Sequence, residues 1–164
     1  MNREDLEGEL EKLHGTSFAW AVGCCRRDRE EAEDVLQETY LKILDGRARF
    51  AGSSSFKTFL FGVIRRTAAE HRRRTWLRRL RIAAFNRSAV MPVPPAGLEA
   101  RLSRLPDALA KLAKKQREVL ELVFGHEMTI AEAAHAMGIS LGSARVHYER
   151  GKKRLRRELD AEQP

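Results

Sequence analysis

Two short amphipathic helices joined by a sharp turn are encoded in residues 129–155, and this segment constrains the fold more than any other part of the chain. Thr129 and Glu132 have the spacing of a capping box, in which each side chain satisfies the backbone amide of the other residue. A helix is therefore predicted to begin directly after Thr129. Gly138 can adopt the positive φ that a sharp turn requires, and Ser140 can cap a second helix. The segment is predicted to form a helix-turn-helix.

The second of these helices has a side suited to a core and a side suited to solvent. Ala144, Tyr148, Gly151 and Leu155 recur at helical spacing and are predicted to face the core. The opposite side is rich in cations, which fits a helix lying in the major groove of DNA. A plain helical hairpin with a solvated charged face is the alternative. The residues predicted to point outward are Arg145, Glu149, Arg150, Lys152 and Lys153.

Charge is unevenly distributed along the 164 residues, whose formal net charge is +8. Residues 1–45 hold six Lys or Arg against twelve Asp or Glu. Residues 46–101 hold thirteen against two, and residues 102–164 hold twelve against nine. An acidic head followed by a strongly basic middle predicts two different partners, with polyanion binding concentrated after residue 46. The net charge alone does not distinguish DNA from RNA or from an anionic membrane.

Other functional classes find no support in the sequence. Cys24 and Cys25 would point about 100° apart on a helix, so they are badly placed for a disulfide with each other, and a reduced cytoplasmic protein is expected. A metal site that joins them to His14 lacks the usual ligand spacing. No apolar stretch approaches the roughly 20 residues that span a bilayer, and no phosphate loop or catalytic motif occurs. We therefore expect no enzyme activity, metal, cofactor, small-molecule substrate or membrane insertion.

Helical periodicity covers most of the chain, without an alternating strand pattern of any length. A three- or four-helix domain is predicted for residues 1–75. A flexible Pro-containing linker follows at 76–101, where three prolines in four positions exclude a helix. A second helical domain at 102–160 contains the helix-turn-helix. The predicted fold class is all-α, with two small helical domains joined by this linker.

Arginines concentrate between residues 65 and 81, where eight of them meet the single acidic residue Glu70. Such self-repulsion favours a nucleic-acid face over a merely solvated surface. Phe50 and Phe56 bracket a serine-rich loop just ahead of this segment, and aromatic rings beside cations can stack on unpaired bases. Core packing is at least an equal alternative for Phe56, Phe59 and Phe61.

A polar helical surface is predicted within residues 30–39, where Asp34, Gln37 and Glu38 fall on one side. Acidic residues in a first turn also complement the helix dipole. From the residues alone, this surface is interpreted as solvated.

Taken together, these motifs resemble the extracytoplasmic-function sigma factors, the smallest promoter-specificity subunits of bacterial RNA polymerase. Residues 28–44 are similar to the family's polymerase-binding helix, 50–74 to its segment for the minus 10 promoter element, and 105–155 to its domain for the minus 35 element. The motifs follow the family's order over nearly the whole chain. The resemblance implies a cytoplasmic alternative sigma factor that binds core RNA polymerase and promoter DNA to direct transcription initiation, with an anti-sigma factor as a further partner.

The resemblance also implies roles for individual residues. Core polymerase is expected to bind Asp34, Gln37 and Glu38, which reverses the interpretation of that surface as merely solvated. The expected contacts with the minus 10 element, including a base flipped from the non-template strand, are Phe50, Gly52, Ser53, Ser54, Ser55, Arg65, Arg66 and Arg73. The expected contacts with the minus 35 element are Ser143, Arg145, Val146, Glu149, Arg150 and Lys153.

The chain departs from the family at two places that affect promoter choice. Arg66 stands where the family commonly has Asn beside the flipped base, and Val146 and His147 replace two polar residues of the recognition helix. The promoter sequence therefore does not follow from the resemblance. Two other functions stay open: a sigma mimic that sequesters an anti-sigma factor, and a stand-alone helix-turn-helix regulator. The cations within residues 65–81 and 145–153 argue against a sigma mimic, which would not reach DNA. A stand-alone regulator would leave the acidic segment at residues 1–45 without a function.

Overall fold

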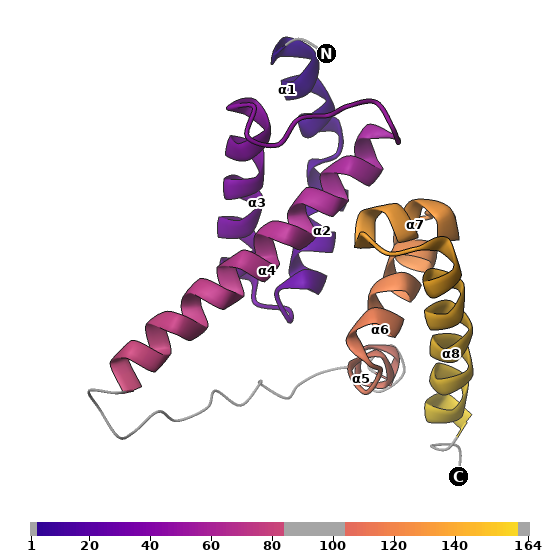
Figure 1. Cartoon of the computed structure of the whole chain (residues 1–164). Helices are drawn as coiled ribbons and strands as arrows, with labels where there is room; N and C mark the ends of the chain where they lie inside the picture. Colours follow the sequence, from indigo (N-terminus) through magenta and orange to yellow (C-terminus); the bar gives the residue numbers. More distant parts are fainter. Residues whose placement is uncertain (1–2, 84–103, 161–164) are drawn as a thin grey trace.

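The computed structural model describes residues 3–83 and 104–160, and every regular element in these two ranges is a helix (Figure 1). The all-α prediction is confirmed. The first helical unit contains α1 (Arg3–Lys12), α2 (His14–Cys24), α3 (Arg29–Leu44) and α4 (Phe56–Ala83). The second helical unit contains α5 (Arg104–Ala110), α6 (Lys114–Leu120), the π-helical turn η1 (Glu121–Gly125), α7 (Ile130–Met137) and α8 (Leu141–Asp160).

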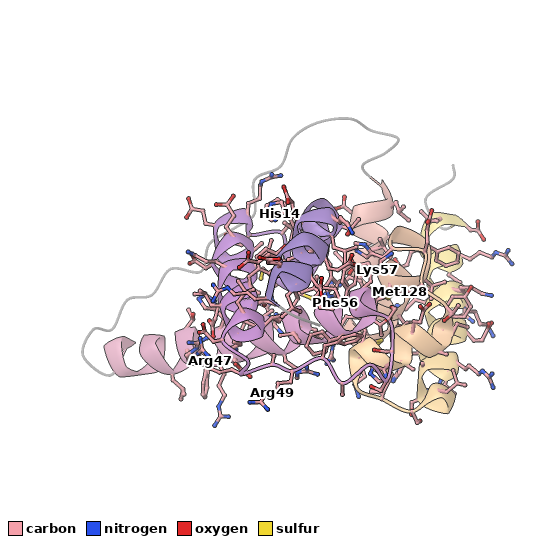
Figure 2. All side chains as sticks on the ribbon, turned by 90° about the horizontal axis from the view of Figure 1, so that it is seen from above. His14, Arg47, Arg49, Phe56, Lys57 and Met128 are labelled. Atoms are coloured by element: carbon pink, nitrogen blue, oxygen red, sulfur yellow. The ribbon has the colours of Figure 1, made fainter. Side chains whose placement is uncertain are left out.

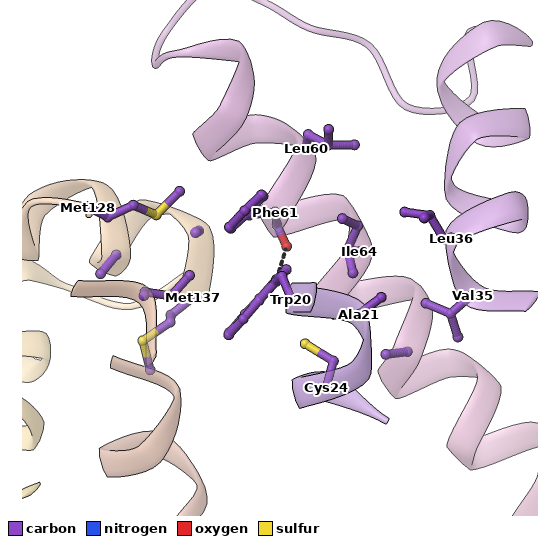
Figure 3. Packing of buried hydrophobic residues seen from close by; sticks show 14 of the residues in the cluster. Trp20, Ala21, Cys24, Val35, Leu36, Leu60, Phe61, Ile64, Met128 and Met137 are labelled. Atoms are coloured by element: carbon purple, nitrogen blue, oxygen red, sulfur yellow. Dashed lines mark hydrogen bonds between the residues drawn. The ribbon is translucent and has the colours of Figure 1, made fainter. Parts of the chain in front are cut away.

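The first helical unit is built by α2, α3 and α4 around a shared core (Figure 3). Val35 and Leu36 of α3 and Leu60 and Ile64 of α4 are buried there. The start of α3 is fixed by Asp28, whose side chain accepts a hydrogen bond from the amide of Glu31 at 3.0 Å. The packing of α3 on α2 and α4 leaves its other side open to solvent.

The α4 helix is longer than the sequence predicts. It continues to Ala83, so its last turns occupy residues 76–83 of the predicted linker at 76–101. These residues include no proline or glycine, and Leu and Arg are strong helix formers, which accounts for the continuation. The proline-rich remainder of the predicted linker lies outside the described residues.

The predicted helix-turn-helix is confirmed in α7 and α8. The Thr129 hydroxyl accepts from the amide of Glu132 at 3.2 Å, and the Glu132 carboxylate accepts from the amide of Thr129 at 2.9 Å. Gly138 ends α7 with φ of +64°, a conformation that costs glycine no steric strain. Ser140 then accepts from the amide of Ser143 at 3.2 Å and caps α8.

Candidate nucleic-acid interface

The α8 helix is held in place by its inner side. Ala144 and Gly151 are buried, and Tyr148 and Leu155 are half-buried, as predicted. At Gly151 an added Cβ would lie 3.1 Å from the Leu120 side chain, so α8 packs tightly against α6 at this position. This packing fixes which side of α8 meets solvent.

The outer side of α8 collects the residues predicted to contact the minus 35 element. Each of them is exposed, and Val146 leaves 46% of its surface in solvent. Lys152 pairs with Glu149 at 3.3 Å and lies 4.7 Å from the centre of the Tyr148 ring, which orders this part of the surface. The structure therefore brings together Ser143, Arg145, Val146, Glu149, Arg150 and Lys153 on one solvent-facing side of a single helix.

The loop before α4 has a partly structural function. Phe50 is half-buried and meets the rings of Phe56 and Phe59, with centroids 5.5 and 5.4 Å away. Ser55 caps α4 by accepting from the amide of Thr58 at 3.2 Å. Between these two anchors the loop protrudes, with Gly52 and Ser53 exposed, Ser54 half-buried, and a φ of +73° at Gly52.

A pocket of about 300 Å³ opens beside this loop, between the end of α3 and the outer side of α4. Arg66 lies in its lining, where the resemblance places the flipped base. Figure 2 shows Arg47 and Arg49 at the outer edge of the molecule, on the loop that follows α3. The sequence analysis did not single out these two arginines. The lining residues are Lys42, Arg47, Ala48, Arg49, Phe59, Val63, Arg66, Thr67 and Glu70.

The predicted minus 10 arginines of α4 do not share one environment. Arg66 and Arg73, two turns apart, are both exposed. Arg65 lies on another side of the helix, where its Nε donates to Glu118 at 3.1 Å. Arg72, which directly precedes Arg73, donates to the backbone carbonyl of Cys24. Arg66 and Arg73 are therefore accessible to a polyanion in this conformation, whereas Arg65 is already paired.

The residues of the acidic surface of α3 also differ in their exposure and pairing. Asp34 and Gln37 are exposed, while Glu38 pairs with Arg74 at 2.6 Å and with Lys42 at 3.1 Å. Partial burial acts to raise the pKa of Glu38, but the hydrogen bonds and charges of Arg74 and Lys42 outweigh it and lower the pKa below its ordinary value. Asp34 and Gln37 thus offer the more open part of this surface.

The adjacent cysteines are free and buried. Burial is the main cause that raises the pKa of the Cys25 thiol to about 12, and it raises that of Cys24 further, so both groups stay protonated and unreactive. In residues 3–83 and 104–160, no group of three or more His, Cys, Asp or Glu side chains could hold a metal ion. No helix in the described part of the chain has the length and apolarity to cross a membrane.

Comparisons with known proteins give a consistent result over both units. Sigma-70 region 2 matches residues 11–78, and Sigma-70, region 4 matches residues 102–155. The ECF RNA polymerase sigma factor SigF of Caulobacter vibrioides is 31% identical over 126 residues, which cover 76% of this chain and 69% of the relative. The ECF RNA polymerase sigma factor SigX of Bacillus subtilis is 28% identical over 142 residues, which cover 82% and 73%.

Two solved structures share the fold. The sigma factor RpoE from Bartonella quintana, in complex with the anti-sigma factor NepR, has a TM-score of 0.73 and 23% identity over 98% of this chain and 99% of that chain. CnrH, in complex with the cytosolic domain of CnrY, has a TM-score of 0.68 and 23% identity over 99% and 92%. The chain therefore shares its arrangement of helices with two proteins to which its sequence identity is only 23%.

Proposed function

Since the chain belongs to the extracytoplasmic-function sigma factors of bacterial RNA polymerase, we propose that three of its surfaces have separate roles in promoter-specific initiation. The open side of α3 binds core polymerase, the pocket beside α4 receives the minus 10 element, and the outer side of α8 reads the minus 35 element. The first helical unit and the second helical unit are the two working domains, joined through residues 84–103.

The polymerase contact centres on Asp34 and Gln37, because these two side chains are exposed on one side of α3. Glu38 contributes at the edge, where its pairs with Arg74 and Lys42 connect this surface to α4. A carboxylate beside an amide offers acceptors and donors to a basic, polar partner. The surface therefore suits a polar contact that is formed and released in each initiation cycle.

The minus 35 contact is supported by the chemistry of the exposed side of α8. Arg145 can donate two hydrogen bonds to a guanine, and Glu149 can accept from a cytosine amino group. Val146 is an exposed apolar residue that can contact a thymine methyl group. Arg150 and Lys153 supply charge to the phosphates, which positions the helix without reading sequence.

The minus 10 contact is supported by the pocket that contains Arg66. Its volume of about 300 Å³ and the apolar side chains of Phe59 and Val63 suit an unstacked base, and its cations attract the phosphates on either side. Lys42 donates to Glu70 at 2.6 Å and to Thr67 at 3.2 Å, so these groups form an ordered wall. Gly52 to Ser55 would close over the base from the loop.

An anti-sigma factor is proposed as the regulatory partner. The second helical unit has a groove on α8 beside Phe124, which is 63% exposed, and Leu155 and Leu159 are the other apolar residues of a lining that is otherwise charged. Lys152, Lys153 and Arg156 line the same groove, so it fits an amphipathic segment with acidic residues at its edges. Such a segment would also cover cations needed for DNA. The chain acts where core polymerase is, in the cytoplasm, and as an initiation factor without catalysis of its own.

The observation that carries this function is the solvent-facing side of α8, on which all six residues predicted for base and phosphate contacts are exposed while the opposite side is locked against α6. The test is run-off transcription on genomic fragments with purified core polymerase. We expect discrete transcripts that require both the chain and core polymerase. A sigma mimic would give none, and a stand-alone regulator would bind DNA without core polymerase and give none. Either result would contradict the proposal.

A further inference from the structure

Val146 lies near the centre of the outer side of α8, the helix at the outer edge of the second helical unit (Figure 1). Successive residues of an α-helix are offset by about 100°, so Arg150 lies about 40° to one side of Val146 and Glu149 about 60° to the other. Val146 leaves 46% of its surface exposed, and Glu149 is exposed beside it. The partner of α8 therefore meets an apolar side chain next to a carboxylate.

The Glu149 carboxylate pairs with Lys152. Their charged groups are 3.3 Å apart, and the Lys152 ammonium also lies 4.7 Å from the centre of the Tyr148 ring. Because the phosphates of DNA repel a carboxylate, cations on the same helix are needed to offset that repulsion in a groove. Arg145 and Arg150 are both exposed on the outer side of α8 and add to the positive potential around Glu149.

Val146 and Glu149 are three residues apart, so they are neighbours on the surface of the helix, with Cβ atoms about 5–6 Å from each other. In the major groove, a carboxylate accepts a hydrogen bond from the amino group at C4 of cytosine, and an apolar side chain contacts a methyl group at C5 of a pyrimidine. These two substituents stand on adjacent ring carbons. One pyrimidine that carries both would meet Glu149 and Val146 together.

The standard bases match this pair of side chains only in part. Thymine has the methyl group at C5 but a carbonyl at C4, whose oxygen repels an ionised carboxylate because both are acceptors. Cytosine has the amino group but no methyl group, so Val146 would be left without a contact. Adenine also presents an amino group without a methyl group. The base that offers both groups is 5-methylcytosine.

We propose that Val146 and Glu149 together recognise 5-methylcytosine, so that methylation of one cytosine in the minus 35 element strengthens promoter binding by this chain. The inference rests on the proposed function, which places α8 in the major groove of that element. It adds that the methylation state of the promoter, and not only its sequence, sets the level of transcription. Burial of one methyl group against Val146 corresponds to about three- to fourfold tighter binding.

The test places cytosine, 5-methylcytosine or thymine at each position of the upstream element, on either strand, in a promoter first selected from a randomised template library. Run-off transcription is measured with core polymerase and a limiting concentration of the chain, so that the amount of transcript follows promoter binding. We expect one position at which 5-methylcytosine gives about three- to fourfold more transcript than cytosine and on the order of tenfold more than thymine.

Two variants separate the contributions of the two side chains. Val146→Ser removes the apolar contact, so the ratio of transcription with 5-methylcytosine to that with cytosine should fall to about one at this position, and Val146→Ile should restore it. Glu149→Gln gains a donor that can bind the thymine carbonyl, so it should lose the discrimination against thymine and keep the preference for 5-methylcytosine over cytosine.

The matched control is Leu159→Ser, which removes an exposed apolar side chain from the far end of α8. It should leave both ratios unchanged, because position 159 is about 20 Å along the helix axis from position 146. A loss of the preference for 5-methylcytosine in Leu159→Ser would overturn the assignment to Val146.

Transcription with 5-methylcytosine that is equal to or below that with cytosine at every position would overturn the inference, as would a gain that persists in Val146→Ser. A preference for thymine over 5-methylcytosine at the position that responds to Val146→Ser would also overturn it, because Val146 and Glu149 would then contact different bases. The absence of promoter-specific transcripts on every template would instead overturn the proposed function. The two failures are distinguishable because only the first leaves the unmethylated promoter active with the wild-type chain.

Discussion

At the scale of single residues, His126 meets the rings of Trp20 and Phe61 edge-on, with centroids 5.8 and 4.9 Å away, and its pKa is shifted strongly. Burial, followed by the charge of Lys57, lowers the pKa of His126 to about 4. In the unfolded chain the value is about 6.5. The folded chain therefore binds fewer protons between these values, and the contribution of His126 to stability is full above about pH 6.5 and falls as the pH drops toward 4.

We predict that acidification weakens the packing of His126 against Trp20 and Phe61. In a Trp76→Phe background, Trp20 is the remaining tryptophan, and its emission should shift to the red between about pH 6.5 and 4 as it leaves the buried cluster. His126→Gln should reduce this shift. Glu121 titrates in the opposite sense, because burial raises its pKa, so Glu121→Gln serves as the companion variant. Identical pH profiles with and without His126 would contradict this assignment.

Arg66 is the departure from the family with the clearest consequence for DNA. It lies in the pocket with three other cations, Lys42, Arg47 and Arg49, and this density favours phosphate attraction over base reading. We predict that Arg66→Asn weakens open-complex formation and lowers the salt dependence by about one phosphate contact, with unchanged base preference at the flipped position. The measurement compares promoters carrying each of the four bases at several salt concentrations.

The control for Arg66→Asn is Arg3→Asn, which removes an exposed arginine from α1 and should leave open-complex formation unchanged. A change in base preference in Arg66→Asn would show that the guanidinium reads the base.

At the scale of the elements, substitutions at exposed positions of α3 can test the proposed polymerase contact without changing the stability of the fold. Asp34 is exposed, so Asp34→Lys should leave thermal unfolding unchanged and weaken association with core polymerase on the order of tenfold. Glu33→Lys makes the same charge change on an adjacent, exposed side of α3 and should have a much smaller effect. Equal losses for both variants in a titration would indicate a general charge effect and not a docking surface.

The elements that the sequence predicted best are those defined by local rules. The capping box at Thr129, the turn at Gly138 and the exposed side of α8 follow from residue spacing alone, and the structure confirms them. The extension of α4 to Ala83 was not predicted, because the change of composition at Trp76 was interpreted as a boundary although the residues that follow are good helix formers.

The contacts between elements could not be predicted, because they depend on how distant segments meet. The pairing of Glu38 with Arg74 joins residues 36 apart in the sequence, and that of Arg65 with Glu118 joins residues 53 apart. No spacing rule connects such residues. The predicted minus 10 set therefore named Arg65 without its partner Glu118, and it did not include Lys42, Arg47 and Arg49, which line the pocket together with Arg66.

At the scale of the whole molecule, the proposed function places the minus 10 contact on the first helical unit and the minus 35 contact on the second. Residues 84–103 connect α4 to α5, so binding of one unit raises the local concentration of the other at the promoter.

The most direct test of this account is in vitro transcription of a randomised template library by core polymerase with the chain, followed by sequencing of the templates that are transcribed. We predict two separated enriched elements for the wild-type chain. Arg145→Ala should relax the preference at one base pair of the upstream element, at a cost of about 1–3 kcal/mol, and leave the downstream element intact. A single enriched element, or the loss of both elements together in Arg145→Ala, would contradict the assignment of α8 to the minus 35 element and of the α4 pocket to the minus 10 element.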